Sequence, residues 1–244
     1  MRTIKLTIEY DGTNYAGWQI QKNGVTVQQV MEEALVKVLG AQVRLHSSGR
    51  TDAGVHAQGM VAAFRTDSRI PLAAFSDGIN TFLPPDIAVR AAEEAAPGFD
   101  PRRHAKGKHY RYTILNTGRR SPLNRLYAWH LRGELDLEAM RQAAMHMVGE
   151  KDFAAFRTAG CAARTTVREI FSVDVTREGE LVLIDVKGPG FLRNMVRIMV
   201  GTLVEAGTGK LPAAAVPLFF GGKNGATAGM TAPPHGLCLI EVYY

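Results

Sequence analysis

The fold class is decided by the stretch RTIKLTIEYDGTNYAGWQIQKNGVTVQQVMEEALVKVLG, residues 2–40. Its first part predicts a half-buried strand, because apolar residues alternate with polar ones at Ile4, Leu6, Ile8 and Tyr10. Its last part predicts a helix, in which apolar residues follow helical spacing at Val27, Val30, Ala34, Leu35 and Val38. Thr26 can cap this helix and Gly40 can end it.

The rest of the chain continues this order of elements. The first half adds strands near 42–48 and 58–66, a helix near 71–83 that ends before Pro84-Pro85, and a strand near 87–93. After a loop from Pro97 to Lys108 come a strand near 107–116, a helix near 136–148, strands near 166–176 and 180–187, a helix near 192–206 and a strand near 236–243. The order strand, helix, strand, strand, helix, strand therefore occurs twice.

Two copies of a split βαβ unit explain this order most economically. We predict an α+β fold of two ferredoxin-like (βαββαβ) halves. The halves form a broad antiparallel sheet with helices on one face and a basic cleft between them. The predicted domains are residues 1–104 and residues 105–244.

Composition bounds the function classes. The 244 residues are 46% hydrophobic and 21% charged, which is ordinary for a globular protein with a sizeable core. Only Cys161 and Cys238 occur, without a CxxC pair, which argues against a disulfide framework and a structural zinc site. The start of the chain resembles a strand and not an export signal, and no apolar run approaches the ~20 residues of a membrane span. We expect a soluble, cytoplasmic protein.

The sequence offers no sign of a cofactor. GTGK at 207–210 resembles part of a phosphate-binding loop, but Val204 and Leu211 stand where that pattern needs Gly and Ser or Thr. None of the seven histidines lies in an HExxH motif or in metal-ligand spacing with a cysteine. We therefore predict no metal, nucleotide or organic cofactor.

Positive charge is concentrated in one segment. The net charge is +6, and residues 101–133, here called the basic segment, contain no acid. Its cations are Arg102, Arg103, Lys106, Lys108, Arg111, Arg119, Arg120, Arg125 and Arg132, with His104, His109, Tyr110, Tyr112, Tyr127 and Trp129 among them. A solvated face usually mixes both signs, so this pattern favours a surface that binds a polyanion such as RNA.

One carboxylate stands in unusually bare surroundings. In SSGRTDAGVHAQG, residues 47–59, Asp52 follows Arg50 by two residues and is otherwise flanked by glycine and alanine. Asp beside Gly is common turn chemistry. The functional alternative is a carboxylate in a pocket whose small neighbours leave room for a ligand. Such a group needs a nearby cation to stay ionised, because desolvation raises its pKa.

A helix in the second half offers that cation. GFLRNMVRIMVGTLVEAG, residues 190–207, carries Arg193 and Arg197 one turn apart on an otherwise apolar helix. Either arginine can reach solvent along its aliphatic stem. For Arg197, in the middle of the helix, pairing with an anion is the favoured alternative, and Asp52 is the candidate anion.

Two further segments carry aromatic residues. KHYRYTILN, residues 108–116, places Tyr110 and Tyr112 on the strand face that also carries Lys108. Aromatics beside cations suit the stacking of an unpaired base, although either tyrosine could equally belong to the core. YDGTNYAGWQ, residues 10–19, is best explained as a tight turn with a packed Trp18.

These blocks together resemble the TruA family of tRNA pseudouridine synthases. The resemblance is carried by YDGTNYAGWQ, GRTDAGVHA, KHYRYTILN, DFAAFR at 152–157, FLRNMVRIMVGTLVEAG and APPHGLCLIEVYY, in that order over almost the whole chain. One departure is Glu150-Lys151 before DFAAFR, where the family has a histidine just before the aspartate.

The resemblance implies a homodimer that isomerises uridine to pseudouridine at positions 38 to 40 of the tRNA anticodon stem-loop. It implies that Asp52 is the catalytic nucleophile, that Arg197 pairs with it and that Tyr110 contacts the target base. Arg50 would fill the space left by the flipped nucleotide. The predicted contacts to the RNA backbone are Arg102, Arg103, Lys106, Lys108 and Arg119.

Two alternatives belong to other classes. A non-catalytic tRNA-binding or tRNA-folding module would keep the basic segment without needing Asp52. A small-molecule hydrolase using Asp52 with His56 leaves the basic segment unexplained and lacks a second placed carboxylate.

Overall fold

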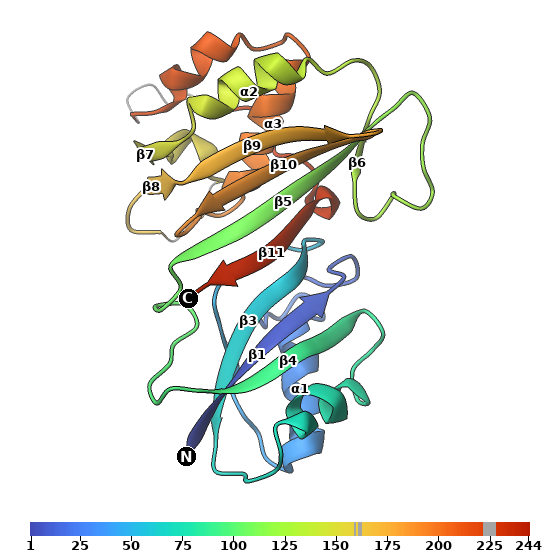
Figure 1. Cartoon of the computed structure of the whole chain (residues 1–244), viewed down its shortest axis with the longest axis vertical. Coiled ribbons are helices and arrows are strands. Elements are labelled where there is room, and N and C mark those ends of the chain that lie inside the picture. The colour runs from blue at the N-terminus through green and yellow to red at the C-terminus, as the bar shows by residue number, and fades with distance from the viewer. Residues whose placement is uncertain (159, 161–162, 222–227) are drawn as a thin grey trace. The chain divides into compact units, whose positions relative to one another are not determined.

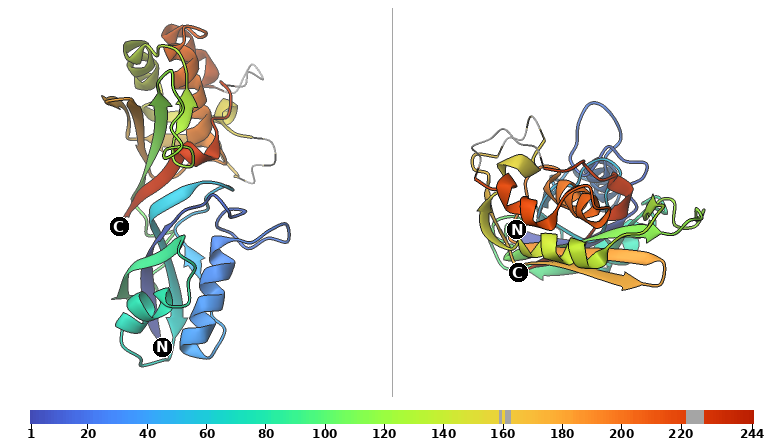
Figure 2. Two further views of the ribbon diagram at one scale, coloured as in Figure 1. Left: turned by 90° about the vertical axis from the view of Figure 1, so that its right-hand side faces the viewer. Right: turned by 90° about the horizontal axis from the view of Figure 1, so that it is seen from above.

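The computed structural model describes residues 1–158, 160, 163–221 and 228–244, so Cys161 lies outside the described residues (Figures 1 and 2). The chain is a mixed α/β protein that divides into two compact units. The first unit is Met1–Lys106 with Cys238–Tyr244, and the second is Gly107–Leu237. Within the described residues, no helix combines the length and the apolar character needed to cross a membrane.

The first unit is built on β1 (Arg2–Tyr10), β3 (His56–Thr66) and β4 (Ile87–Ala95), in the antiparallel order β4-β1-β3. It also contains α1 (Val27–Leu39), β2 (His46–Ser47), a π-helical turn η1 (Ala74–Gly78) and the last strand β11 (Leu237–Tyr243) from Cys238 onward. The edge of β3 opposite β1 pairs with β2 near one end and with β11 near the other.

The signals in residues 2–40 operate as predicted. Ile4, Leu6 and Ile8 are fully buried, and they form the core with the buried face of α1. The Thr26 hydroxyl accepts a hydrogen bond from the backbone N–H of Gln29 at 3.4 Å, a cap that stabilises a helix by about 1 kcal/mol. Gly40, at φ 69°, ends the helix in the left-handed conformation.

The second unit contains a sheet of four strands in the order β6-β5-β10-β9. They are β5 (Gly107–Asn116), β6 (Trp129–Leu131), β9 (Ser172–Glu178) and β10 (Leu181–Gly188). A separate pair is formed by β7 (Gly149–Asp152) and β8 (Val167–Ile170). The helices are α2 (Leu137–Met145) and α3 (Met195–Gly207), with short 3-10 turns η2 (Ala154–Phe156), η3 (Ala213–Phe219) and η4 (Pro234–Gly236). Seen from above, α2 and α3 lie on the same side of β9 and β10 (Figure 2).

Several predicted elements differ in extent. The predicted strand 42–48 is reduced to the two residues of β2. Side chains of α1 occupy the backbone of Leu45, since Gln28 donates to its C=O and Glu32 accepts from its N–H. The predicted helix 71–83 contains a π-helical turn of five residues, η1. The predicted strand 166–176 is two strands that belong to different sheets, β8 and β9.

Two corrections concern the sheet and the domain boundary. The sheet is not wholly antiparallel, because β11 runs parallel to β3 and β6 runs parallel to β5. The predicted division at 104/105 lies close to the observed one at 106/107. Residues 238–244, however, were predicted in the second domain and belong to the first unit, where Cys238 and Leu239 pair with His56 and Ala57.

Candidate active site

Asp52 lies in the turn between β2 and β3, as predicted, and is half-buried. Its neighbours Thr51 and Val55 are buried. The Val55 N–H donates to the backbone oxygen of Asp52 at 3.2 Å and closes the turn. The carboxylate is thus carried by a turn that is anchored on both sides, which limits how far it can move. Arg50, in the same turn, is exposed.

The segment from the last residue of β1 to Trp18, residues 10–18, packs against this turn. The Tyr10 and Thr51 hydroxyls lie 2.8 Å apart in a buried hydrogen bond. The Trp18 N–H donates to the Thr51 carbonyl at 3.2 Å, and the Gly54 N–H donates to the Tyr15 carbonyl at 3.4 Å. We call residues 10–18 the clasp. Trp18 is 1% exposed, as expected of a packed tryptophan, but the contacts with the Asp52 turn were not predicted.

Two glycines make the close approach possible. A Cβ atom on Gly17, whose φ is +90°, would lie 2.6 Å from the Thr51 carbonyl oxygen. A Cβ on Gly12 would lie 2.0 Å from the Val55 carbonyl oxygen. Both distances are shorter than the closest approach that a Cβ atom can make to a backbone oxygen. Glycines between aromatic residues were the sequence signal for this packing, although they do not identify the partner segment.

His56 links the clasp to the start of β3. Its ring is 5% exposed, and its Nδ1 accepts a hydrogen bond from the Gly12 N–H at 3.0 Å. Nδ1 also lies 3.1 Å from the Asp11 carboxylate, which accepts from the N–H and hydroxyl of Thr13. These contacts give His56 a structural role in the site.

The clasp is held from its other side by Asp86. The Tyr15 hydroxyl donates to Asp86 at 2.6 Å, and the Asp11 N–H donates to the Asp86 carbonyl at 2.9 Å. Burial raises the pKa of Tyr15, and the hydrogen bond to Asp86 raises it further. Tyr15 therefore stays a protonated donor at any physiological pH.

In the second unit, Arg197 of α3 and Arg193, which precedes α3, differ in their surroundings. Arg197 is half-buried, its Nε donates to the Ala232 carbonyl at 2.7 Å, and its Nη1 donates to Asn194 Oδ1 at 2.9 Å. Arg193 is exposed. The two arginines shared a predicted helix face, but Arg193 precedes α3, which begins only at Met195, so Arg197 alone is held in place.

The two tyrosines of β5 also separate. Tyr110 is 8% exposed and packs edge-on against Phe191, with ring centroids 5.3 Å apart. Tyr112 is fully buried, and its hydroxyl donates to the Pro233 carbonyl at 2.8 Å. Burial raises the pKa of Tyr112, and the charge of Arg197 opposes that rise. Tyr112 is therefore a core residue, and Tyr110 remains the candidate for base contact.

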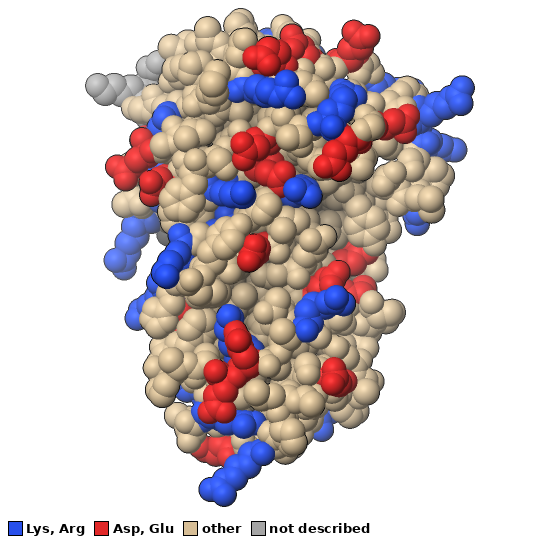
Figure 3. Space-filling view, in the orientation of Figure 1, with Lys and Arg blue, Asp and Glu red and all other residues tan. Residues whose placement is uncertain are grey.

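The basic segment is less uniformly positive in space than in sequence. Asp185 of β10 lies against β5, where Arg111 donates two hydrogen bonds to its carboxylate, at 2.9 and 3.1 Å, and His109 lies 2.5 Å away. Burial raises the pKa of Asp185, but the hydrogen bonds and charges of Arg111 and His109 outweigh it and the pKa is lowered. Acidic and basic side chains also alternate on the face shown in Figure 3.

The predicted RNA-backbone residues are mostly at the surface. Arg102, Arg103, Lys106 and Arg119 are exposed, and Lys108 is half-buried. Arg103 lines a hollow of about 660 Å³ in the first unit, together with Arg44, Arg65, His46 and His104. The only acid among the lining residues is Asp100, whose pKa is lowered chiefly by hydrogen bonds from the backbone N–H groups of Arg103 and Arg102.

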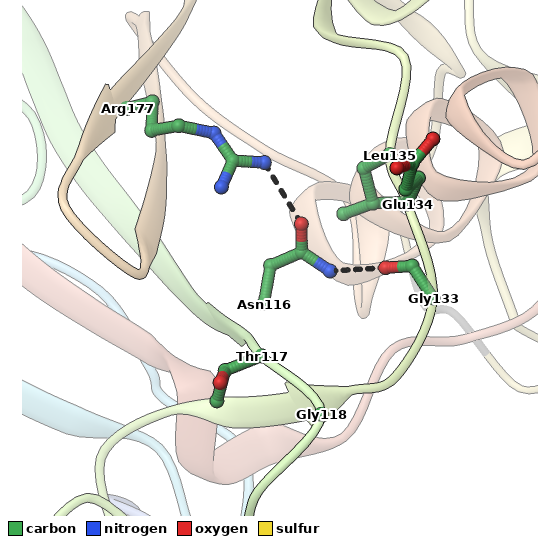
Figure 4. Close-up of a pocket in the computed structure, with 7 residues that line it drawn as sticks. All are labelled: Asn116, Thr117, Gly118, Gly133, Glu134, Leu135 and Arg177. Atoms are coloured by element: carbon green, nitrogen blue, oxygen red, sulfur yellow. Dashed lines mark hydrogen bonds between the residues drawn. The ribbon is translucent and has the colours of Figure 1, made fainter.

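A second hollow, of about 540 Å³, lies in the second unit (Figure 4). Asn116 stands at its centre, where its Oδ1 accepts from Arg177 and its Nδ2 donates to the Gly133 carbonyl, both at 2.8 Å. These bonds tie the end of β5 to β9 and to the segment before α2. The polar groups here hold elements together, and we assign the hollow a structural role.

The predicted site residues are divided between the units. Asp52 and Arg50 belong to the first unit, and Tyr110 and Arg197 belong to the second. In the described part of the chain, no group of His, Cys, Asp or Glu side chains could hold a metal ion.

Comparisons with known proteins agree with the motifs. The family model described as tRNA pseudouridine synthase matches residues 6–102 and 143–244. The tRNA pseudouridine synthase A of Geobacter sulfurreducens is 64% identical and that of Geotalea uraniireducens 63%, each over 244 residues and the full length of both chains. That of Myxococcus xanthus is 50% identical over all of this chain and 92% of its own.

Among solved structures, one chain of the archaeal box H/ACA sRNP Nop10-Cbf5 complex is similar. The alignment covers 93% of this protein and 48% of that chain. The TM-score of 0.36 and the identity of 13% are too low to bear on function. The match to the family model and the identities over whole chains decide the assignment: this chain belongs to the tRNA pseudouridine synthase family.

Proposed function

We propose that this isomerase converts uridine to pseudouridine at positions 38 to 40 of the tRNA anticodon stem-loop, with Asp52 as its nucleophile. The observation that carries the proposal is the Asp52 turn itself. It holds a half-buried carboxylate in a fixed turn whose neighbouring residues are small. Family membership supports tRNA as the substrate class.

The reaction needs few groups. The bond between ribose C1′ and uracil N1 breaks, the base turns, and a bond from C1′ to C5 forms, while C5 loses a proton and N1 gains one. No electron acceptor and no net water are consumed. The base must first leave the helix, at a cost of a few kcal/mol. An ionised Asp52 could attack C1′, add to the pyrimidine ring or remove the 2′ proton, and these three routes stay open.

The other roles follow from the sequence motifs and are supported by local geometry. Arg197 is proposed to keep Asp52 ionised, and its guanidinium is already oriented by two uncharged oxygens. Tyr110 is proposed to contact the flipped base, which its slight exposure and its edge-on support by Phe191 favour. Arg50 is proposed to occupy the space of the flipped nucleotide, and its exposed side chain is compatible with that role.

We infer that the RNA backbone contacts Arg102, Arg103, Lys106, Lys108 and Arg119. The hollow around Arg103 adds Arg44 and Arg65 as neighbouring cations, which supports a phosphate-binding surface in the first unit. An RNA substrate is also consistent with the expected cytoplasmic location.

We also infer that both units derive from ferredoxin-like halves. In the first, the strand order β4-β1-β3 with β2 beside β3 is the order such a half requires. In the second, β10 lies between β5 and β9 as expected, and the strand that follows α3 in sequence is β11. The homodimer implied by the resemblance stays a prediction, which sedimentation equilibrium would test.

The direct test of the function is to incubate the protein with unmodified tRNA and locate pseudouridine by mass spectrometry. Conversion at positions 38 to 40 is expected. A protein that binds tRNA tightly but converts no uridine would instead be the non-catalytic tRNA-binding or folding module, the remaining alternative.

A further inference from the structure

Asn194 has an unusual backbone conformation at the start of α3. Its φ of 60° and ψ of 5° are left-handed, and among the described residues it is the only non-glycine residue with positive φ. Ten described glycines occupy such conformations, which is the ordinary solution because glycine has no Cβ to clash. An L residue in this conformation is strained, and strain of this kind is concentrated at functional sites.

The Asn194 side chain does not cap the helix that it precedes. An asparagine at this position normally accepts a hydrogen bond from an N–H in the first turn, but Asn194 makes no such bond. Its Oδ1 accepts from Arg197 Nη1 at 2.9 Å, and its Nδ2 donates to the Thr158 hydroxyl at 3.1 Å. The side chain is therefore directed at Arg197 and anchored from behind.

Two acceptors that bind Arg197 share one property. Asn194 Oδ1 and the Ala232 carbonyl are both uncharged, and they bind Nη1 at 2.9 Å and Nε at 2.7 Å, respectively. They fix the plane and direction of the side chain without neutralising its charge. A carboxylate in place of Asn194 would orient the arginine equally well but would compete with any other anion.

We propose that Asn194 is a positioning residue of the isomerase, which orients the guanidinium of Arg197 for the reaction. The inference rests on the proposed role of Arg197. The left-handed conformation places the amide where it reaches both Arg197 and Thr158, and this accounts for an asparagine where glycine would be unstrained.

The test compares Asn194→Gly, Arg197→Lys and the double variant with wild type, in kcat and KM for tRNA and in melting temperature. Glycine relieves the backbone strain, which offsets the loss of the two side-chain hydrogen bonds, so Asn194→Gly should fold with a melting temperature close to that of wild type. We expect its kcat to fall about ten- to a hundredfold, because a misplaced reacting group has that effect. KM for tRNA should stay within about twofold, because Asn194 acts through Arg197.

Asn116→Ala is the matched control. It removes a similar set of side-chain hydrogen bonds from the same unit, at the hollow in Figure 4, and should leave kcat unchanged. If Asn194 acts through Arg197, the double variant should be no slower than Arg197→Lys alone.

Wild-type kcat in Asn194→Gly, or losses that multiply in the double variant, would overturn the positioning role. Wild-type kcat in Arg197→Lys would also overturn it, because the charge alone would then suffice without an oriented plane. Failure of the proposed function has a different signature, since the wild-type protein would then form no pseudouridine in the mass-spectrometric test.

Discussion

Arg197 shows how uncharged groups can orient one charged side chain. It belongs to a largely apolar helix, α3, and its guanidinium donates hydrogen bonds to uncharged oxygens of Ala232 and Asn194. A guanidinium is well suited to this arrangement, because its donors are fixed in one plane and cannot rotate independently. A lysine ammonium group at the same position would carry the charge but would not hold its donors in one fixed plane.

This difference gives the first prediction, for Arg197→Lys. The charge is kept but the two oriented hydrogen bonds are not, so we expect kcat to fall by about tenfold or more while tRNA binding changes little. Steady-state kinetics on unmodified tRNA measure both quantities. Activity equal to wild type would show that charge alone suffices and that the fixed plane has no role.

At the scale of single residues, the sequence identifies the groups whose surroundings are local. Asp52 is recognisable from its glycine- and alanine-rich motif, and Arg197 from its place in an apolar helix. Tyr112 could not be separated from Tyr110, because alternation along a strand tells which face a residue occupies but not what covers it. Pro233, which accepts the Tyr112 hydrogen bond, lies 121 positions away in sequence.

At the scale of elements, the clasp restricts the movement of the turn that carries Asp52. Tyr10, Tyr15 and Trp18 share hydrogen bonds with Thr51 and Gly54, on either side of Asp52. Gly12 and Gly17 allow the two backbones to approach closely. Because reacting groups must be placed within a fraction of an ångström, the clasp should matter for rate more than for binding.

Gly17→Ala tests the clasp, with Gly40→Ala as its control. Both glycines have positive φ, so Gly40→Ala should destabilise by about 1–2 kcal/mol, and Gly17→Ala should destabilise by more because its Cβ also meets backbone. Only at Gly17 does the new Cβ meet the Asp52 turn, whereas at Gly40 nothing lies within 4 Å. We therefore expect kcat to fall about tenfold or more in Gly17→Ala alone. Equal kcat in the two variants would show that the clasp does not position Asp52.

Asp185, with its partners Arg111 and His109, predicts that stability depends on pH. The pKa of Asp185 is lowered from the usual 3.8 in the folded protein, so ionised Asp185 stabilises the fold above that value. The contribution disappears as the pH falls from about 4 through the lowered pKa. Chemical denaturation should show Asp185→Asn to be less stable than wild type by about 1–3 kcal/mol at pH 7. The difference should shrink at pH 3, and a constant difference would contradict the cluster's role.

Whether most segments form a helix or a strand follows from the sequence. Their lengths depend on contacts with other elements, which compete with strand pairing for the backbone. The alternating residues after α1 predict a longer strand than β2, but side chains of α1 bind the backbone of Leu45. The strand predicted over 166–176 divides near Phe171, whose N–H donates to the Lys187 carbonyl. Neither competitor is adjacent in sequence, so local periodicity cannot reveal it.

At the scale of the whole molecule, the repeated order of elements predicts two units but not the return of the chain. The final strand has the pattern of any half-buried strand, and only its pairing with His56 and Ala57 assigns Cys238–Tyr244 to the first unit. The sheet edge with which a strand pairs depends on contacts between segments far apart in sequence. The local pattern of residues in the strand does not reveal these contacts.

Binding of the polyanion also belongs to this scale. Replacing Arg102, Arg103 and Arg119 by Gln should weaken tRNA binding and reduce its dependence on salt, by about 0.7–0.9 in logarithmic slope for each phosphate that is no longer neutralised. Titrations at several salt concentrations measure the slope. Arg90→Gln is the control, because Arg90 is an exposed cation paired with Glu9 on another part of the first unit. An unchanged slope in the triple variant would exclude these residues from the RNA surface.

An ionised Asp52 is proposed to carry out the chemistry. Release of tritium from tRNA labelled at C5 of uridine tests this role. Measured in a single turnover with saturating enzyme, Asp52→Asn should release essentially no tritium while binding tRNA with near wild-type affinity. Appreciable release by this variant would contradict the account, because an amide cannot supply the nucleophile or base that every proposed route requires.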